Sequence, residues 1–553
     1  MFLRTLVQKK GDRKYKYLQI LESYREGRSV KQRTLLSFGN IDRWPKERLQ
    51  KLIRLLQVMI GEEPGLSVGD VKVVSSVCYG PGLALGAVWR SIGMPQMIDV
   101  AIKDRHPEFD VPSVIEAMVL NRLVEPKSKL GVSRWIRRNY LCGLPLEKEL
   151  PVQYLYRSLD YLTEAKEDLE EAIYRSVSDL FTLDVSLVFY DITSSYFEGN
   201  RCSLSKRGYS RDHRPDLYQI ELGLVINPDG IPICHEVFEG NLKDVVTVPE
   251  VVKSLKERFN VVQVIFVGDS GMVGPDTTKA LDDAGYQYIL AQKLRRNSEL
   301  YPVIFSMGEK QDWEKVLDNL YVKELESPFE KRRLIGCYNP VRAAQERSDR
   351  QVKLHRMDEY LKSFERPRRR GQTKDPVSIE RQIRSFLERR CIGKFFEFSY
   401  RDEGDFSFSR RDDAIADEER LDGLRILETT SQLPAADVAK SYRMLSEVED
   451  SFREMKSFVR IRPIRHFNDL RVKGHVTVCV LAYLMERLME RMLGAAGLDM
   501  TAQSALEELK GIDLVTLELD GARLRKSVEP NKLQTQILEA LVVKKIPKLM
   551  PAD

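Results

Sequence analysis

Two apolar runs that each end in an aspartate decide the fold: VSLVFYD (Val185–Asp191) and VVQVIFVGD (Val261–Asp269). Continuous apolar runs of this length are typical of strands buried on both faces of a sheet. A carboxylate at the end of such a strand is costly to bury, so backbone hydrogen bonds or a divalent cation must compensate its charge. Asp191 and Asp269 are therefore the first candidates for a functional site.

The segments around these runs predict the rest of a mixed α/β sheet. A turn signal at Asn227–Gly230 separates two further strands. The further predicted strands are Leu217–Ile226, Ile231–Phe238 and Tyr286–Leu290. The predicted helices are Val246–Arg258 and Gly274–Ala284. The order is strand, strand, strand, helix, strand, helix, strand, and it could place the two aspartates side by side.

The first third of the chain has a different pattern. Short alternating runs in residues 1–40 predict a small antiparallel sheet, and residues 45–60 repeat apolar positions at helical spacing. Residues 80–180 are expected to be helical. The helix after Pro112 and the next one, which carries Arg134, Arg137 and Arg138, are compatible with either a helix-turn-helix or a plain helical bundle.

A helix late in the chain supplies the third acidic candidate. Its predicted apolar face consists of Leu445, Val448, Phe452, Met455 and Val459. Tyr442, Glu449 and Lys456 are seven residues apart and therefore line one stripe beside that face, which Arg453 joins one turn beyond Glu449. Taken alone, this stripe is more typical of an exposed, salt-bridged helix.

Together these motifs resemble the DDE transposases of bacterial insertion sequences. The matching segments are Tyr190–Ser194 with Tyr196–Gly199, Tyr209–Leu224, Glu239–Asn241, Val267–Gly271 and Tyr442–Lys456. One branch of that family carries the signature Tyr-x2-Arg-x3-Glu-x6-Lys, and Tyr442, Glu449 and Lys456 have this spacing. Leu445 stands at the arginine position, where Arg443 or Arg453 could substitute. The resemblance covers residues 185–295 and 436–485.

The resemblance implies a ribonuclease-H-like mixed sheet interrupted by a long insertion, and a catalytic triad of Asp191, Asp269 and Glu449. These carboxylates would hold two Mg²⁺ ions about 4 Å apart, which Mn²⁺ could replace. One ion would activate water or a DNA 3′-hydroxyl, and the other would stabilise the leaving oxygen. Lys456 and Tyr442 would contact backbone phosphates. The expected activity is cleavage of transposon ends and their transfer to target DNA.

The net charge of +5 conceals two basic regions. The first forty residues carry +7, and residues 331–400 carry +10, including Arg368, Arg369 and Arg370. Clustering of this kind suits either phosphate binding or a solvated face. Aromatic residues of the insertion could stack an unpaired base at a transposon end, although core packing is the favoured role for each: Trp313, Phe395, Phe396, Phe406 and Phe408.

These patterns divide the chain into six expected regions. They are a small basic β/α region (1–75), a helical DNA-binding region (76–180), the first part of the catalytic core (181–295), the insertion (296–435), the second part of the core (436–500) and a C-terminal region (501–553). Seven widely spaced cysteines without a CxxC pair predict reduced core thiols, and no signal peptide or membrane span is expected.

The expected setting is the bacterial cytoplasm, with the protein on the nucleoid when bound to DNA. The expected partners are double-stranded DNA, as transposon ends and target, and a second copy of the chain in a homodimeric synaptic complex. An alternative is a catalytically inactive, transposase-derived DNA-binding regulator. A phosphatase with Asp191 as nucleophile is disfavoured, because such enzymes need a second aspartate where this chain has Thr193.

Overall fold

The structure, a computed structural model, describes most of the chain. The described residues are 2–10, 13–26, 29–40, 44–60, 71–146, 148–181, 186–259, 264–294, 298–308, 310–364, 376–389, 392–400, 406–519, 522–543, 546 and 549–551. Two compact units divide the chain: Met1–Val88 with Gly131–Leu150 and Met492–Asp553, and Trp89–Leu130 with Pro151–Arg491.

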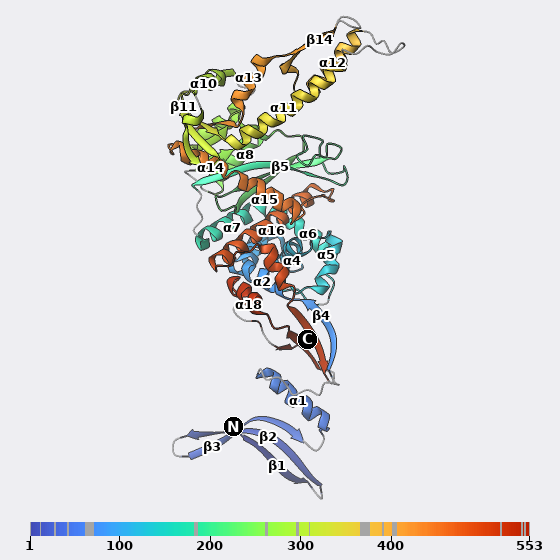
Figure 1. Ribbon diagram of the computed structural model, residues 1–553. Helices are drawn as coiled ribbons and strands as arrows, with labels where there is room; N and C mark the ends of the chain where they lie inside the picture. The colour runs from blue at the N-terminus through green and yellow to red at the C-terminus, as the bar shows by residue number, and fades with distance from the viewer. Residues whose placement is uncertain are drawn as a thin grey trace, which may run out of the picture. The chain divides into compact units, whose positions relative to one another are not determined.

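The first unit contains two small antiparallel sheets (Figure 1). Strands β1 (Phe2–Lys10), β2 (Arg13–Glu26) and β3 (Ser29–Asn40) form one sheet, which is followed by helix α1 (Lys46–Met59). This confirms the predicted sheet and helix. The second sheet has the order β18-β17-β16-β4 and is accompanied by two helices. Its elements are β4 (Val71–Cys78), β16 (Asp513–Leu519), β17 (Ala522–Ser527), β18 (Leu549–Pro551), α17 (Ala502–Leu509) and α18 (Lys532–Ala540).

Residues 80–181 are helical, as predicted. The helices are α2 (Gly80–Ser91), α3 (Met94–Ala101), α4 (Val111–Val124), α5 (Lys129–Trp135), α6 (Val152–Glu164) and α7 (Lys166–Phe181). Helix α4 begins after Asp110, whose side chain accepts a hydrogen bond from the Ser113 backbone N–H and satisfies one open donor of the first turn. Every residue from Val111 to Leu123 is buried, so α4 is a core helix.

The second unit is built on one nine-stranded sheet with the order β10-β11-β12-β15-β9-β8-β5-β6-β7. Strands β5, β6 and β7 are antiparallel, whereas β8 runs parallel to both β5 and β9. The elements of this half are β5 (Leu187–Tyr196), β6 (Gln219–Ile226), β7 (Pro232–Glu239), α8 (Asp244–Glu257), β8 (Ile265–Gly268), α9 (Pro275–Ala284) and β9 (Gln287–Ala291). The predicted order of strands and helices is confirmed.

The insertion extends this sheet as well as interrupting it. Strand β15 pairs with β9 in antiparallel register, and β12, β11 and β10 follow outward. Strands β10 to β12 were not predicted, because these short segments lack a clear apolar alternation in the sequence. The elements of the insertion are α10 (Tyr301–Ser306), β10 (Glu314–Leu317), β11 (Leu320–Leu325), β12 (Arg333–Tyr338), α11 (Pro340–Lys362), α12 (Pro376–Arg389), β13 (Phe396–Tyr400), β14 (Phe406–Arg410), α13 (Asp412–Leu421) and β15 (Leu424–Thr429).

The aromatic residues of the insertion pack into its own two cores. Trp313 is buried among residues of α10, β11, β12 and β15. Phe395 and Phe396 are buried between α11, α12 and the β13–β14 hairpin, with Phe406 and Phe408 packed against them. The favoured prediction of core packing for these five residues is therefore confirmed.

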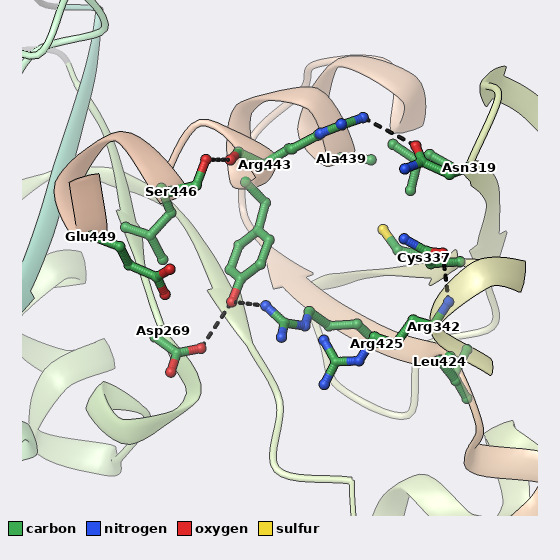
Figure 2. A pocket seen from close by; sticks show the side chains of 15 residues that line it. Asp269, Asn319, Cys337, Arg342, Leu424, Arg425, Ala439, Arg443, Ser446 and Glu449 are labelled. Atoms are coloured by element: carbon green, nitrogen blue, oxygen red, sulfur yellow. Dashed lines mark hydrogen bonds between the residues drawn. The ribbon is translucent and has the colours of Figure 1, made fainter. Parts of the chain in front are cut away.

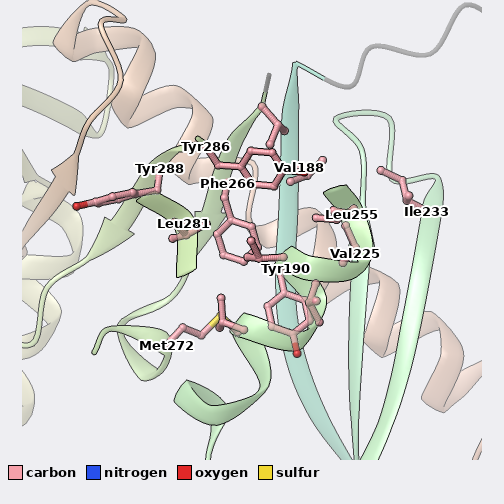
Figure 3. Close-up of a cluster of buried hydrophobic side chains, with 14 of the residues drawn as sticks. Val188, Tyr190, Val225, Ile233, Leu255, Phe266, Met272, Leu281, Tyr286 and Tyr288 are labelled. Carbon is pink, nitrogen blue, oxygen red and sulfur yellow. The ribbon is translucent and has the colours of Figure 1, made fainter. Parts of the chain in front are cut away.

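The alternation of side chains along β5 separates a core face from a polar face. Val188, Tyr190 and Ile192 belong to a buried cluster with α8 and α9 (Figure 3). The Tyr190 hydroxyl donates a hydrogen bond to Thr247 Oγ1 on α8 at 2.8 Å. Because successive side chains of a strand point to opposite faces, Asp191 belongs to the other face. Figure 1 shows α8 and α15 on opposite sides of β5.

Two helices, not one, follow the insertion, and this corrects the prediction. Helix α14 (Ala435–Arg443) ends before α15 (Ser446–Ser457) begins, so Tyr442 and Glu449 lie on different helices. The junction is a tight turn in which the N–H groups of Leu445 and Val448 bond three residues back instead of four. The long helix α16 (Asp469–Ala495) follows, as predicted. Among the described helices none is long and apolar enough to cross a lipid bilayer.

Candidate active site

Asp191 lies in the middle of β5 and does not end it, contrary to prediction. The strand continues to Tyr196, and Thr193 still pairs with Leu222 of β6. The apolar run ends at Asp191 because polar residues follow in the sequence on the side that faces α15. The backbone of the strand nevertheless remains extended. Asp191 itself pairs with Leu224 of β6, so its carboxylate is carried by paired backbone.

Asp269 follows β8 directly, as predicted. The parallel register pairs Phe189 with Val267, so Asp191 and Asp269 come two residues later on neighbouring strands, at the same level of the sheet. Adjacent strands are about 4.8 Å apart. The register therefore explains why the charge of Asp269 affects the pKa of Asp191.

Glu449 lies on α15, which packs against β5 and β6 on the polar face of the sheet. Its side chain is exposed, whereas Asp191 and Asp269 are half-buried. The pKa of Asp191 is raised to about 7, chiefly by burial and also by the negative charges of Asp269 and Glu449, against the opposing effects of the Ile192 N–H and Arg211. Three acids from two strands and one helix therefore share one electrostatic environment.

The donor chemistry of this group fits a hard cation, although no ready-made cage exists. Within the described ranges, no three His, Cys, Asp or Glu side chains are arranged to hold a metal ion. Mg²⁺ usually takes one or two carboxylates together with waters and phosphate oxygens. The pKa of Asp191 is raised chiefly by burial and further by the charges of Asp269 and Glu449, and a bound cation would oppose this by favouring the ionised carboxylate. Asp191, Asp269 and Glu449 are the residues that would hold it.

Tyr442 is connected directly to this group. Its hydroxyl donates a hydrogen bond to Asp269 Oδ1 at 2.9 Å and accepts one from an Arg425 guanidinium nitrogen at 2.6 Å. The Arg425 guanidinium also lies over the Tyr442 ring, 5.0 Å from its centroid. A donor to the phenol oxygen polarises the O–H bond and strengthens its bond to the carboxylate. Tyr442 thus fixes one oxygen of Asp269.

Lys456 lies on the same face of the sheet, and it forms hydrogen bonds with residues other than the three acids. Its ammonium group donates to Thr193 Oγ1 at 2.6 Å and to Asp212 Oδ1 at 2.8 Å, and Arg462 also contacts Asp212. The Asp212 side chain is only 2% exposed, and its Oδ2 has no hydrogen-bond partner among the residues that the structure describes. Asp212 lies in a turn, and its carboxylate is shared by two cations beside the strand that bears Asp191.

The two arginines proposed as substitutes at the signature position have other environments. The Arg453 side chain is 73% exposed and pairs with Asp450 on its own helix. The Arg443 guanidinium donates to the Asn319 side chain at 3.3 Å. Leu445, which occupies the signature position, is buried. Arg368, Arg369 and Arg370 lie outside the described residues.

Arg211 and Arg425 were not among the predicted site residues. Arg211 donates to Glu221 Oε2 and to both oxygens of Asp244, all at 2.8 Å, and its charge lowers the pKa of Asp191. The segment Tyr209–Leu224, which resembles family sequence, contained a signal for Arg211. No sequence signal exists for Arg425, because only the pairing of β15 with β9 brings it near Asp269.

An open cleft of about 420 Å³ adjoins the acids. It is lined by Asp269 and Glu449 together with Tyr442, Arg342, Arg425 and Arg443. Figure 2 shows Asp269 and Glu449 close together at one side, with Arg425 and Arg342 across from them. The site is therefore concave, with acids and guanidinium groups on opposing walls.

Comparison with known families agrees with this geometry. The family described as "IS1634 family transposase, N-terminal domain" matches residues 3–61, and the family described as "Transposase DDE domain" matches residues 185–485. The second match covers more than half of the chain, and the chain belongs to the DDE transposases of insertion sequences. This membership implies a ribonuclease-H-like core and DNA binding. A search of curated proteins gives no match.

Proposed function

We propose that this protein binds the inverted-repeat ends of its transposon and catalyses Mg²⁺-dependent strand cleavage and strand transfer. Asp191, Asp269 and Glu449 are the proposed catalytic and metal-binding residues. The observation that carries the proposal is the proximity of these three acids inside the DDE domain, where burial and then the charges of Asp269 and Glu449 raise the pKa of Asp191. Such a perturbation beside a cleft is typical of functional carboxylates.

Each residue has a defined part in the proposed reaction. Bound Mg²⁺, or Mn²⁺ in its place, would supply an activated nucleophile and stabilise the leaving oxygen of an in-line displacement at phosphorus. The three carboxylates provide the negative oxygen ligands, and Tyr442 holds Asp269 in one orientation. Lys456 would exchange its bond to Asp212 for a DNA phosphate. Capture of two ends implies a dimer during the reaction.

The DNA that flanks the gene provides the direct test. Inverted repeats bracketing the gene are expected, and a duplex carrying one repeat should be nicked at its end by the purified protein with Mg²⁺ but not with EDTA. Binding without nicking at any Mg²⁺ or Mn²⁺ concentration would contradict the proposal. That result would favour the alternative function, an inactive DNA-binding regulator.

Replacement of Tyr442 by phenylalanine is expected to lower the nicking rate by about 10- to 100-fold, since groups that orient metal ligands typically contribute this much. Binding of the end duplex in EDTA should remain within about twofold of wild type, because only a hydroxyl is removed. Tyr301→Phe, a change at a tyrosine on α10, serves as the control and should nick at the wild-type rate. An unchanged nicking rate in Tyr442→Phe would show that the bond to Asp269 has no role in catalysis.

A further inference from the structure

Three arginine side chains line the cleft, and the proposed reaction gives them no role. Arg342 comes from α11, Arg425 from β15 and Arg443 from α14. These three elements meet only because the insertion joins the catalytic sheet through β15 and β9. The cleft thus combines acids of the core with guanidinium groups from outside it.

Two of these arginines lack a carboxylate partner among the residues that the structure describes. Arg342 pairs with Glu346 at 2.8 Å. The only hydrogen bonds of the Arg425 and Arg443 guanidinium groups in this part of the chain go to the Tyr442 hydroxyl and the Asn319 amide oxygen. Each guanidinium carries five N–H donors and a full positive charge, so most of this capacity faces the cleft unused.

Other cations near the acids already have carboxylate partners. Lys456 and Arg462 contact Asp212, and Arg211 binds Glu221 and Asp244. Arg425 and Arg443 differ from these cations, because neither has a carboxylate partner among the described residues. A second cleft of about 380 Å³ shares Asp269, Arg342 and Arg425 in its wall and continues the cationic surface to Lys293.

We propose that the cleft is a binding site for a phosphate group of the DNA backbone, with Arg425 as its main anchor and Arg443 as a second cation that lines the same cleft. This inference rests on the proposed function and deepens it. A guanidinium can bind two phosphate oxygens at once, which fits a site that must hold a strand in register next to the acids. Arg425 thereby supplies, from another strand, the charge that the buried Leu445 cannot supply.

Salt-dependent DNA binding tests this site without any metal ion. Fluorescence anisotropy in EDTA would measure the Kd of a terminal-repeat duplex and of a random-sequence duplex of equal length at several salt concentrations. Loss of one phosphate contact lowers the slope of log Kd against log salt by about 0.9, which is about an eightfold weakening at 0.1 M salt. Arg425→Gln should show this loss, and Arg425→Lys should retain most of the slope.

Arg175→Gln is the matched control, because Arg175 is a 73% exposed arginine that pairs with Glu171 on α7. It should keep the wild-type slope. Arg443→Gln provides a second test variant in case Arg425→Gln unfolds, as judged by thermal melting, and it should also lose slope. A loss seen only with the terminal-repeat duplex assigns the phosphate to the transposon end, and an equal loss with both duplexes assigns it to the backbone of any DNA, including the target.

A methylphosphonate scan of the end duplex locates the phosphate. The neutral linkage at the correct position should weaken wild type about as much as Arg425→Gln and should weaken that variant no further. If wild type nicks the end but both arginine variants keep the wild-type slope, the inference is overturned while the proposed function stands. If wild type neither binds nor nicks the end, the proposed function itself fails.

Discussion

Asp191→Asn is expected to abolish end cleavage, with a loss on the order of 1,000-fold or more, and to leave end binding intact. The change preserves the shape of the side chain but removes an anionic oxygen ligand. Loss of a group that only orients a metal ligand costs about 10- to 100-fold, so loss of a ligand should cost more. Single-turnover nicking of the end duplex and anisotropy in EDTA would measure the two effects separately.

The same variant should be at least as stable as wild type when metal is absent. In EDTA at pH 8, the neutral amide of Asp191→Asn would relieve the repulsion that Asp269 and Glu449 exert on a half-buried carboxylate. Thermal melting would measure this. Asp229→Asn, at a turn aspartate that pairs with Arg491, is the control and should cleave normally. Residual cleavage by Asp191→Asn within tenfold of wild type would remove Asp191 from the catalytic group.

Glu170→Gln is expected to produce the largest loss of stability, about 3–5 kcal/mol. Glu170 on α7 is 8% exposed, and its carboxylate accepts hydrogen bonds from the His235 backbone N–H at 3.1 Å and from Arg258 at 2.8 Å. Lys166 lies 3.6 Å away. Removing the charge leaves these cations incompletely compensated inside the protein. At about 2–4 °C per kcal/mol, the melting temperature of this unit should fall by about 10 °C.

The pH dependence of this loss follows from the direction of the pKa shift. Burial alone would raise the pKa of Glu170, but Lys166, His235 and Arg258 outweigh it and lower the value to about 2. The folded pKa is below the unfolded one, so the stabilisation is present above pH 4.5 and disappears as pH falls toward 2. The difference between wild type and Glu170→Gln should shrink across that window.

Glu257→Gln is the matched control. Glu257 is the last residue of α8, and its side chain is 63% exposed and pairs with the exposed Lys253. Such a pair contributes about 0–1 kcal/mol, so this variant should melt close to wild type. Equal melting of Glu170→Gln and wild type at pH 7 would show that the buried cluster does not stabilise the unit.

The sheet around Asp191 and Asp269 was predictable because its strands are apolar and its turns are explicit. Continuous runs such as Val264–Gly268 leave little choice other than a buried strand. The length of β5 was not predictable, since the polar residues after Asp191 end the apolar pattern but not the pairing with β6. Likewise, a single apolar periodicity runs through α14 and α15, and it hides the tight turn at Met444 and Leu445.

The residues of the site also divide into those that the sequence predicted and those that it did not. Asp191, Asp269, Glu449, Tyr442 and Lys456 could be singled out because they follow a buried strand or recur at regular spacing. Their partners could not, because the contacts cross long distances in sequence. Asp212 reaches Lys456 across 244 positions, and Tyr442 reaches Asp269 across 173. Only the assembled sheet brings such groups together.

The pairing of β15 with β9 means that the insertion cannot be removed like a loop. Strands β12 and β15 continue the ladder outward from β9, whose side chains are almost all buried. A chain shortened at the insertion would leave the backbone groups of β9 open along an apolar edge, and such an edge recruits strands from other molecules. Shortened relatives of this protein would therefore need a replacement strand or a polar cover at β9 to remain monomeric before they meet DNA.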